Sequence, residues 1–154
     1  MNAMNDTNEL SDFVTFVTAG QLFGLPIERV QDVFRPSHIT RVPLAGAQIA
    51  GVLNLRGRIV TAIDLRCRLG LGAPEAQSAS MAIGIEFRNE SFGLLVDAVG
   101  EVLKLPNGER EANPINLDRN LARVSAGVFR LDETLLVVLD IERVLDLGSE
   151  AAAA

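Results

Sequence analysis

Short apolar stretches rich in Val, Leu, Ile and Phe follow one another along most of the chain, and polar or glycine-containing turns separate them. Because these stretches are short and bounded by turn residues, they predict β-strands. The predicted strands cover residues 13–17, 22–25, 30–34, 39–42, 52–55, 59–63, 81–87, 92–96, 99–105, 122–130 and 135–139. Many short strands with frequent turn signals are typical of β-barrels. The pattern therefore predicts a mainly β protein.

Short helical turns are expected between some of these strands. They cover residues 26–29, 45–49, 64–70 and 140–147. Asp64 is expected to cap the N-terminus of the helix at 64–70, and Gly70 is expected to end that helix. Asp140 is expected to cap the helix at 140–147. Irregular structure is expected in a flexible N-terminal segment, a linker rich in Gly, Ala and Ser, a long polar loop and a flexible C-terminal tail. These segments are residues 1–11, 71–80, 106–120 and 148–154.

The chain contains an internal repeat. Residues 51–65 align without a gap on residues 127–141, and apolar positions fall on apolar positions. Upstream of each copy lies a second match, between residues 23–33 and 92–102, in the same order. The repeat predicts one small β unit used twice. Units of roughly 60 to 75 residues bury only a modest fraction of their surface, so the two units are expected to share a core.

The two copies differ at one turn. The first carries Asn54-Leu55-Arg56-Gly57 where the second carries Arg130-Leu131-Asp132-Glu133. Glycine permits the left-handed backbone of a tight hairpin, and the Asn54 side chain is expected to hydrogen-bond locally. The guanidinium of Arg56 suits bidentate contact with a partner's carboxylate. A solvated arginine beside an obligatory turn glycine explains the turn equally well, so the residues alone leave both interpretations open.

Composition and charge narrow the class of protein. The chain has 154 residues and no Trp or Tyr, and 48% of its residues are hydrophobic, so its core must be mainly aliphatic. No apolar run approaches the roughly 20 residues of a membrane span, and the polar, acidic N-terminus is no secretory signal. A single cysteine excludes an intramolecular disulfide, and cytoplasmic localisation is expected. The net charge of −6 argues against nucleic-acid binding.

The sequence contains no clear enzymatic constellation. His38 is the only histidine, and it follows Pro36 and Ser37, which indicate a loop. No metal site, catalytic triad or cofactor site is therefore predicted around it. Cys67 lies between Arg66 and Arg68, which would lower its thiol pKa, but a small buried apolar role explains it better. Asp64 and Asp140 are better explained as helix caps than as an acid/base pair.

The stretch from Gly51 to Arg66 contains an Asn-Leu-Arg-Gly turn, then an apolar strand, then Asp-Leu-Arg. With Phe13-Val-Thr-Phe16 and Phe92-Gly-Leu-Leu-Val-Asp97, it resembles the CheW family of chemotaxis coupling proteins. The resemblance covers about residues 12–147. It implies a single CheW-like domain over that range, built from two pseudo-symmetric, intertwined five-stranded SH3-like barrels with short capping helices.

The resemblance also implies partners. Family members join the cytoplasmic tips of methyl-accepting chemoreceptors to the regulatory domain of the histidine kinase CheA, without catalysis or cofactor and without inserting into the membrane. The family's receptor-binding groove would map onto Val30, Asp32, Val33, Gly51, Asn54, Arg56 and Gly57. In this assignment Val30 and Val33 contact a receptor helix tip, while Arg56 and Asp32 supply polar contacts at the rim. Core positions within a barrel remain an equally good explanation of the two valines.

One departure and two alternatives remain. Thr61 stands where the family usually has proline, and it would permit longer strand pairing. The same motifs would fit a coupler of a non-flagellar chemosensory array, such as one for surface motility. A small ligand-binding barrel protein or enzyme that uses the groove is a third possibility, and it lacks a supporting cluster of catalytic residues.

Overall fold

The computed structural model describes residues 9–71 and 81–146, and ten strands form most of this part. The strands are β1 (Leu10–Thr18), β2 (Gln21–Pro26), β3 (Val30–Phe34), β4 (Ile49–Leu55), β5 (Arg58–Asp64), β6 (Met81–Phe87), β7 (Glu90–Val96), β8 (Ala98–Pro106), β9 (Ser125–Arg130) and β10 (Leu135–Leu139). The helices are η1 (Ile27–Arg29), α2 (Leu65–Arg68), η2 (Asn107–Glu109), α3 (Arg119–Val124) and α4 (Ile141–Val144). The prediction of a mainly β protein is confirmed.

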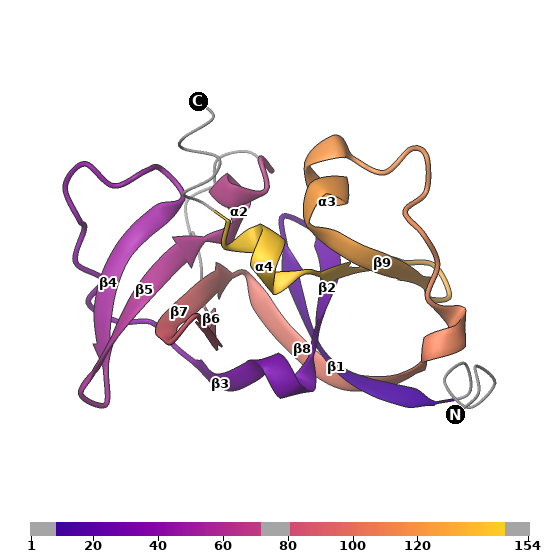
Figure 1. Ribbon diagram of the computed structural model, residues 1–154, viewed down its shortest axis with the longest axis horizontal. Helices are drawn as coiled ribbons and strands as arrows, with labels where there is room; N and C mark the ends of the chain where they lie inside the picture. The colour runs from indigo at the N-terminus through magenta and orange to yellow at the C-terminus, as the bar shows by residue number, and fades with distance from the viewer. Residues whose placement is uncertain (1–8, 72–80, 147–154) are drawn as a thin grey trace.

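The strands form two five-stranded sheets, and each sheet takes strands from both halves of the chain. One sheet has the order β8-β1-β2-β10-β9 and the other β3-β6-β7-β5-β4. Figure 1 shows the second sheet on the left and the first on the right, with α2 and α3 at the top and α4 below them near the centre. The predicted pair of intertwined five-stranded barrels is therefore confirmed.

Strand register shows that the two barrels are pseudo-symmetric. β5 pairs in parallel with β7, with Thr61 opposite Phe92, and β10 pairs in parallel with β2, with Val137 opposite Phe23. These are equivalent positions in the two copies of the repeat. Residues 51–65 and 127–141 both form hairpins, so the prediction of one β unit used twice is confirmed. Thr61 lies inside β5 with partners on both sides, as its replacement of proline predicts.

The barrels share one aliphatic core, as the size of the repeat predicts. The main cluster of buried side chains draws on both sheets and includes Phe16, Phe23, Ile63, Leu94 and Val137. The Phe16 and Phe23 rings stack with their centroids 5.5 Å apart. A smaller apolar cluster of Leu53, Val60 and Ala62 lies within the barrel of β3 to β7.

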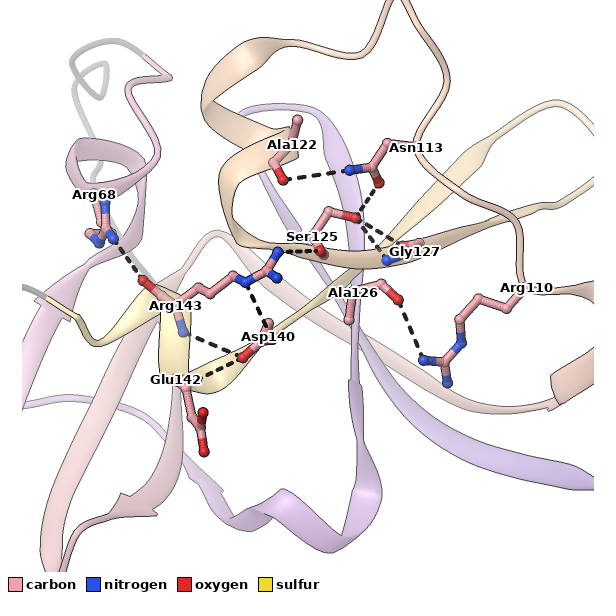
Figure 2. Close-up of polar contacts among 10 residues, drawn as sticks. All are labelled: Arg68, Arg110, Asn113, Ala122, Ser125, Ala126, Gly127, Asp140, Glu142 and Arg143. Atoms are coloured by element: carbon pink, nitrogen blue, oxygen red, sulfur yellow. Dashed lines mark hydrogen bonds and ion pairs between the residues drawn. The ribbon is translucent and has the colours of Figure 1, made fainter.

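The predicted helix caps are confirmed. The Asp64 carboxylate accepts a hydrogen bond from the Cys67 backbone N–H at 3.2 Å. The Asp140 carboxylate accepts from the N–H groups of Glu142 and Arg143 at 3.0 and 3.3 Å (Figure 2). Gly70 follows α2 with a φ of +66°, which suits a glycine after a helix end.

Four predicted elements are corrected. Residues 39–42 do not form a strand, because Thr40 makes only an isolated bridge to Val52 and proline stops the segment at position 43. Residues 45–48 are not helical: residues 47 and 48 form a turn, and β4 already begins at Ile49. The segment predicted to be irregular ends in α3, which also takes residues 122–124 from the predicted strand, because Asp118 caps it. β1 begins within the predicted N-terminal segment, whereas most of that segment, the linker and the tail lie outside the described residues.

Candidate functional site

The Arg56-Gly57 turn is a tight two-residue hairpin loop. Leu55 pairs with Arg58 across it, and Arg56 and Gly57 have φ values of +54° and +82°. Positive φ at both central residues is the geometry that matches the twist of paired strands. The Asn54 Oδ1 atom accepts a hydrogen bond from the Gly57 N–H at 2.9 Å, as predicted. The turn therefore presents the arginine side chain from a fixed backbone.

Three charged side chains meet beside this turn. The Asp32 Oδ2 atom of β3 lies 3.8 Å from Arg56 Nη1 and 3.9 Å from Arg58 Nη2. The other carboxylate oxygen of Asp32 is buried and has no hydrogen-bond partner in the described part of the chain. It is directed at Gly84, its neighbour across β3 and β6, where a Cβ atom would clash with it. One carboxylate thus faces two guanidinium groups, so the cluster is locally positive.

The two valines of β3 lie in different surroundings. Val30 is half-buried and packs against the main core, whereas Val33 is 40% exposed. Phe34, the next residue, packs against the smaller cluster inside the barrel. Val33 is therefore available to a partner, and Val30 supports the strand from within.

Gly51 lies apart from the charged cluster. It is buried, has a φ of +151°, and its hydrogens face the Thr40 carbonyl and the Ile39 side chain. Thr40 and Val52 exchange two backbone hydrogen bonds of 2.8 Å beside it. Asn54 is three residues further along β4, roughly 10 Å away at about 3.3 Å per residue. Gly51 therefore shapes the strand that leads to the turn.

Two shallow hollows flank the charged cluster. One, of about 410 Å³, is lined by Gln31, Asp32, Leu55, Arg56 and Arg58. The other, of about 420 Å³, is lined by Gln31, Arg58, Ile59, Thr61, Glu86, Asn89, Glu90 and Ser91. Gln31 and Arg58 line both. Sequence reasoning missed Arg58, although the equivalent position of the second copy is the uncharged Thr134.

The other reactive side chains do not form a site. His38 is exposed in a loop, as predicted. Cys67 is exposed, so its predicted burial is wrong. Desolvation raises the pKa of the Cys67 thiol above its ordinary value and the Asp64 charge raises it further, which contradicts activation by the flanking arginines. Among residues 9–71 and 81–146, no group of three or more His, Cys, Asp or Glu side chains is placed to hold a metal ion, and no helix is long and apolar enough to cross a membrane.

A polar cluster lies around Gly127, where the second copy of the repeat begins (Figure 2). The Ser125 hydroxyl donates to Asn113 Oδ1 at 2.6 Å, and the Gly127 N–H donates to that hydroxyl at 2.9 Å. Arg143 donates to the Ser125 carbonyl at 3.4 Å, while Arg68 of α2 donates to the Arg143 carbonyl at 2.7 Å. These bonds tie β9 and the short helices together, which is a structural role.

A sequence profile of the CheW-like domain matches residues 12–148, which is most of the chain. The chain belongs to the CheW-like family. The resemblance read from the Asn-Leu-Arg-Gly turn and the flanking strands is thereby confirmed.

Known CheW proteins are similar over nearly their whole length. The Chemotaxis protein CheW of Bacillus subtilis is 29% identical over 140 residues, which are 91% of this chain and 90% of that protein. The Chemotaxis protein CheW of Thermotoga maritima is 27% identical over 146 residues, 95% of both chains. The crystal structure of the scaffolding protein TtCheW from Thermoanaerobacter tengcongensis superposes with a TM-score of 0.80 at 29% identity, covering 90% of each chain.

Proposed function

We propose that this protein is a non-catalytic scaffold that couples the cytoplasmic tips of chemoreceptors to the histidine kinase CheA in chemotaxis signalling. The family assignment supports this proposal, as does similarity over nearly the whole chain to proteins described as chemotaxis and scaffolding proteins. Such a scaffold works in the cytoplasm, where receptor tips and kinase meet.

The receptor-binding surface in this proposal is the face formed by β3, β4 and the hairpin turn. It comprises Val30, Asp32, Val33, Gly51, Asn54, Arg56 and Gly57. The observation that carries the proposal is the placement of Arg56. Its side chain is 80% exposed, it stands on a tight turn that the Asn54 side chain bonds to, and it lies too far from Asp32 for a direct hydrogen bond. Its donors are therefore free to bind a partner.

The remaining residues have distinct roles. Val33 supplies exposed apolar surface on the same strand as Asp32. Asn54 and Gly57 fix the turn through their 2.9 Å hydrogen bond. Val30 and Gly51 act indirectly, because both are at least half-buried and support the strands that carry the contacting side chains.

The test replaces Arg56 by a residue that favours the same turn. Asn-Gly is the preferred pair in this type of hairpin loop, so Arg56→Asn should fold with a free energy of unfolding within about 0.5 kcal/mol of the original. An interface anchor that is lost costs about 2 kcal/mol or more of binding free energy. Binding of receptor cytoplasmic fragments, measured by isothermal titration calorimetry at moderate salt, should therefore weaken at least tenfold. Arg56→Asp, which copies Asp132 of the second copy, should weaken it further.

Arg88 provides a matched control. It is exposed, it lies in the β6–β7 hairpin turn, and its φ of +53° nearly equals that of Arg56. Arg88→Asn removes the same charge from the same backbone geometry but lies away from Asp32, so it should not weaken receptor binding. CheA binding should be retained in all variants. Unchanged receptor affinity in folded Arg56→Asn and Arg56→Asp would refute the assignment of this surface.

A further inference from the structure

The two hollows beside the hairpin adjoin each other, because Gln31 and Arg58 line both. Arg58 and Asp32 lie in the first, and Glu86 and Glu90 lie in the second on the other side of Arg58. A segment that lies along both hollows therefore passes from a positive end to an acidic end.

The positive end has unused hydrogen-bonding capacity. Asp32 offers one oxygen to two guanidinium groups, and both distances exceed hydrogen-bond range. Within the described ranges, Arg56 and Arg58 donate no hydrogen bond to the protein. The Arg58 side chain is 47% exposed against 80% for Arg56, so Arg58 is the more confined of the two and the better placed to orient a bound carboxylate.

The acidic end is held in place. The Gln31 amide donates to Glu86 Oε1 at 2.9 Å, and this bond links the paired strands β3 and β6 beside the second hollow. Glu90 begins β7 in the same hollow. Ile59 lines the same hollow, is 62% exposed and offers apolar surface. The depression thus presents guanidinium groups in the first hollow, and an exposed apolar side chain with two carboxylates in the second.

We propose that this depression selects receptor segments by the direction of their charges, with Arg58 as the specificity-determining residue. The preferred segment carries a carboxylate that binds at Arg58, an apolar side chain against Ile59 and a basic side chain toward Glu86 and Glu90. Opposite charges at both ends favour one orientation of the segment, and like charges disfavour the reverse one. This inference rests on the proposed receptor-binding function of the neighbouring turn.

The experiment measures the binding of receptor cytoplasmic fragments to two variants. Arg58→Thr copies Thr134 of the second copy and suits a strand position, so it should fold normally. It should bind about tenfold more weakly and should depend less on salt, since a charged contact is lost. Glu90→Gln should also weaken binding, by about threefold, because the basic end of the segment loses its partner.

Controls separate this inference from the one on which it rests. Arg123→Ala removes an exposed arginine from α3 in the other barrel and should leave binding unchanged. Loss of binding in Arg56→Asn with unchanged binding in Arg58→Thr would overturn the role of Arg58 alone. Tighter binding of Glu90→Gln would show a uniformly acidic segment and overturn charge-direction selection. If the unmodified protein binds no receptor fragment, both proposals fail.

Discussion

Gly51 provides a quantitative test of how the close approach of the Ile39–Thr40 segment stabilises the barrel. In Gly51→Ala the new Cβ atom would clash with the Thr40 carbonyl and would lie 2.8 Å from Ile39 Cγ2. The φ of +151° also strains any residue other than glycine. Such backbone strain costs about 1–3 kcal/mol. Displacement of Thr40 weakens the two backbone hydrogen bonds to Val52, each worth about 0.5–1.5 kcal/mol.

Together these effects predict that Gly51→Ala lowers the free energy of unfolding by about 3 kcal/mol. Gly57→Ala is the matched comparison, because Gly57 also has positive φ but a Cβ atom there would have no neighbour within 4 Å. That substitution carries only the backbone strain and should cost about 1 kcal/mol. Urea denaturation followed by circular dichroism measures both values. If Gly51→Ala were no more destabilising than Gly57→Ala, the close approach would not be a source of stability.

Two further predictions concern α2. Asp64→Ala should lower the free energy of unfolding by about 1 kcal/mol, because it removes a helix cap, and it should leave partner binding nearly unchanged once the protein is folded. A fully stable Asp64→Ala protein that binds neither kinase nor receptor would instead reveal a functional carboxylate. The second prediction concerns the thiol of Cys67, whose pKa is raised in the folded protein. A smaller fraction of the thiol is therefore present as the reactive thiolate at a given pH. Iodoacetamide at pH 8 should modify the folded protein more slowly than the urea-unfolded chain. Equal rates in the two states would contradict the shift.

The strands and their hairpins were predictable because strand pairing in each copy follows local apolar patterns and turn residues. The repeat likewise predicted the equivalent pairing of residues 51–65 and 127–141. The helix α3 was missed, although Asp118 stands one residue before it as an N-cap. Residues 39–42 were wrongly assigned because their apolar pattern does not reveal that only Thr40 finds a strand partner.

The candidate site was only partly predictable. The Arg56-Gly57 turn and the Asn54 hydrogen bond follow from local sequence, since all their atoms lie within four residues. Arg58 was overlooked because its significance depends on Asp32 and on the β6–β7 hairpin, which are distant in the chain. The exposure of Cys67 was also misjudged, because the sequence of a four-residue helix does not fix which side chain faces the core, and here only Leu65 does.

The exchange of strands between the halves has a mechanical consequence. The chain passes from one sheet to the other between β2 and β3 and returns between β7 and β8. The barrels are therefore joined by two covalent crossings and by the common core (Figure 1). Rotation of one barrel against the other would have to break apart that core and bend both crossings. A force applied at the hairpin of the first barrel would therefore act on the second barrel through the common core and through both crossings.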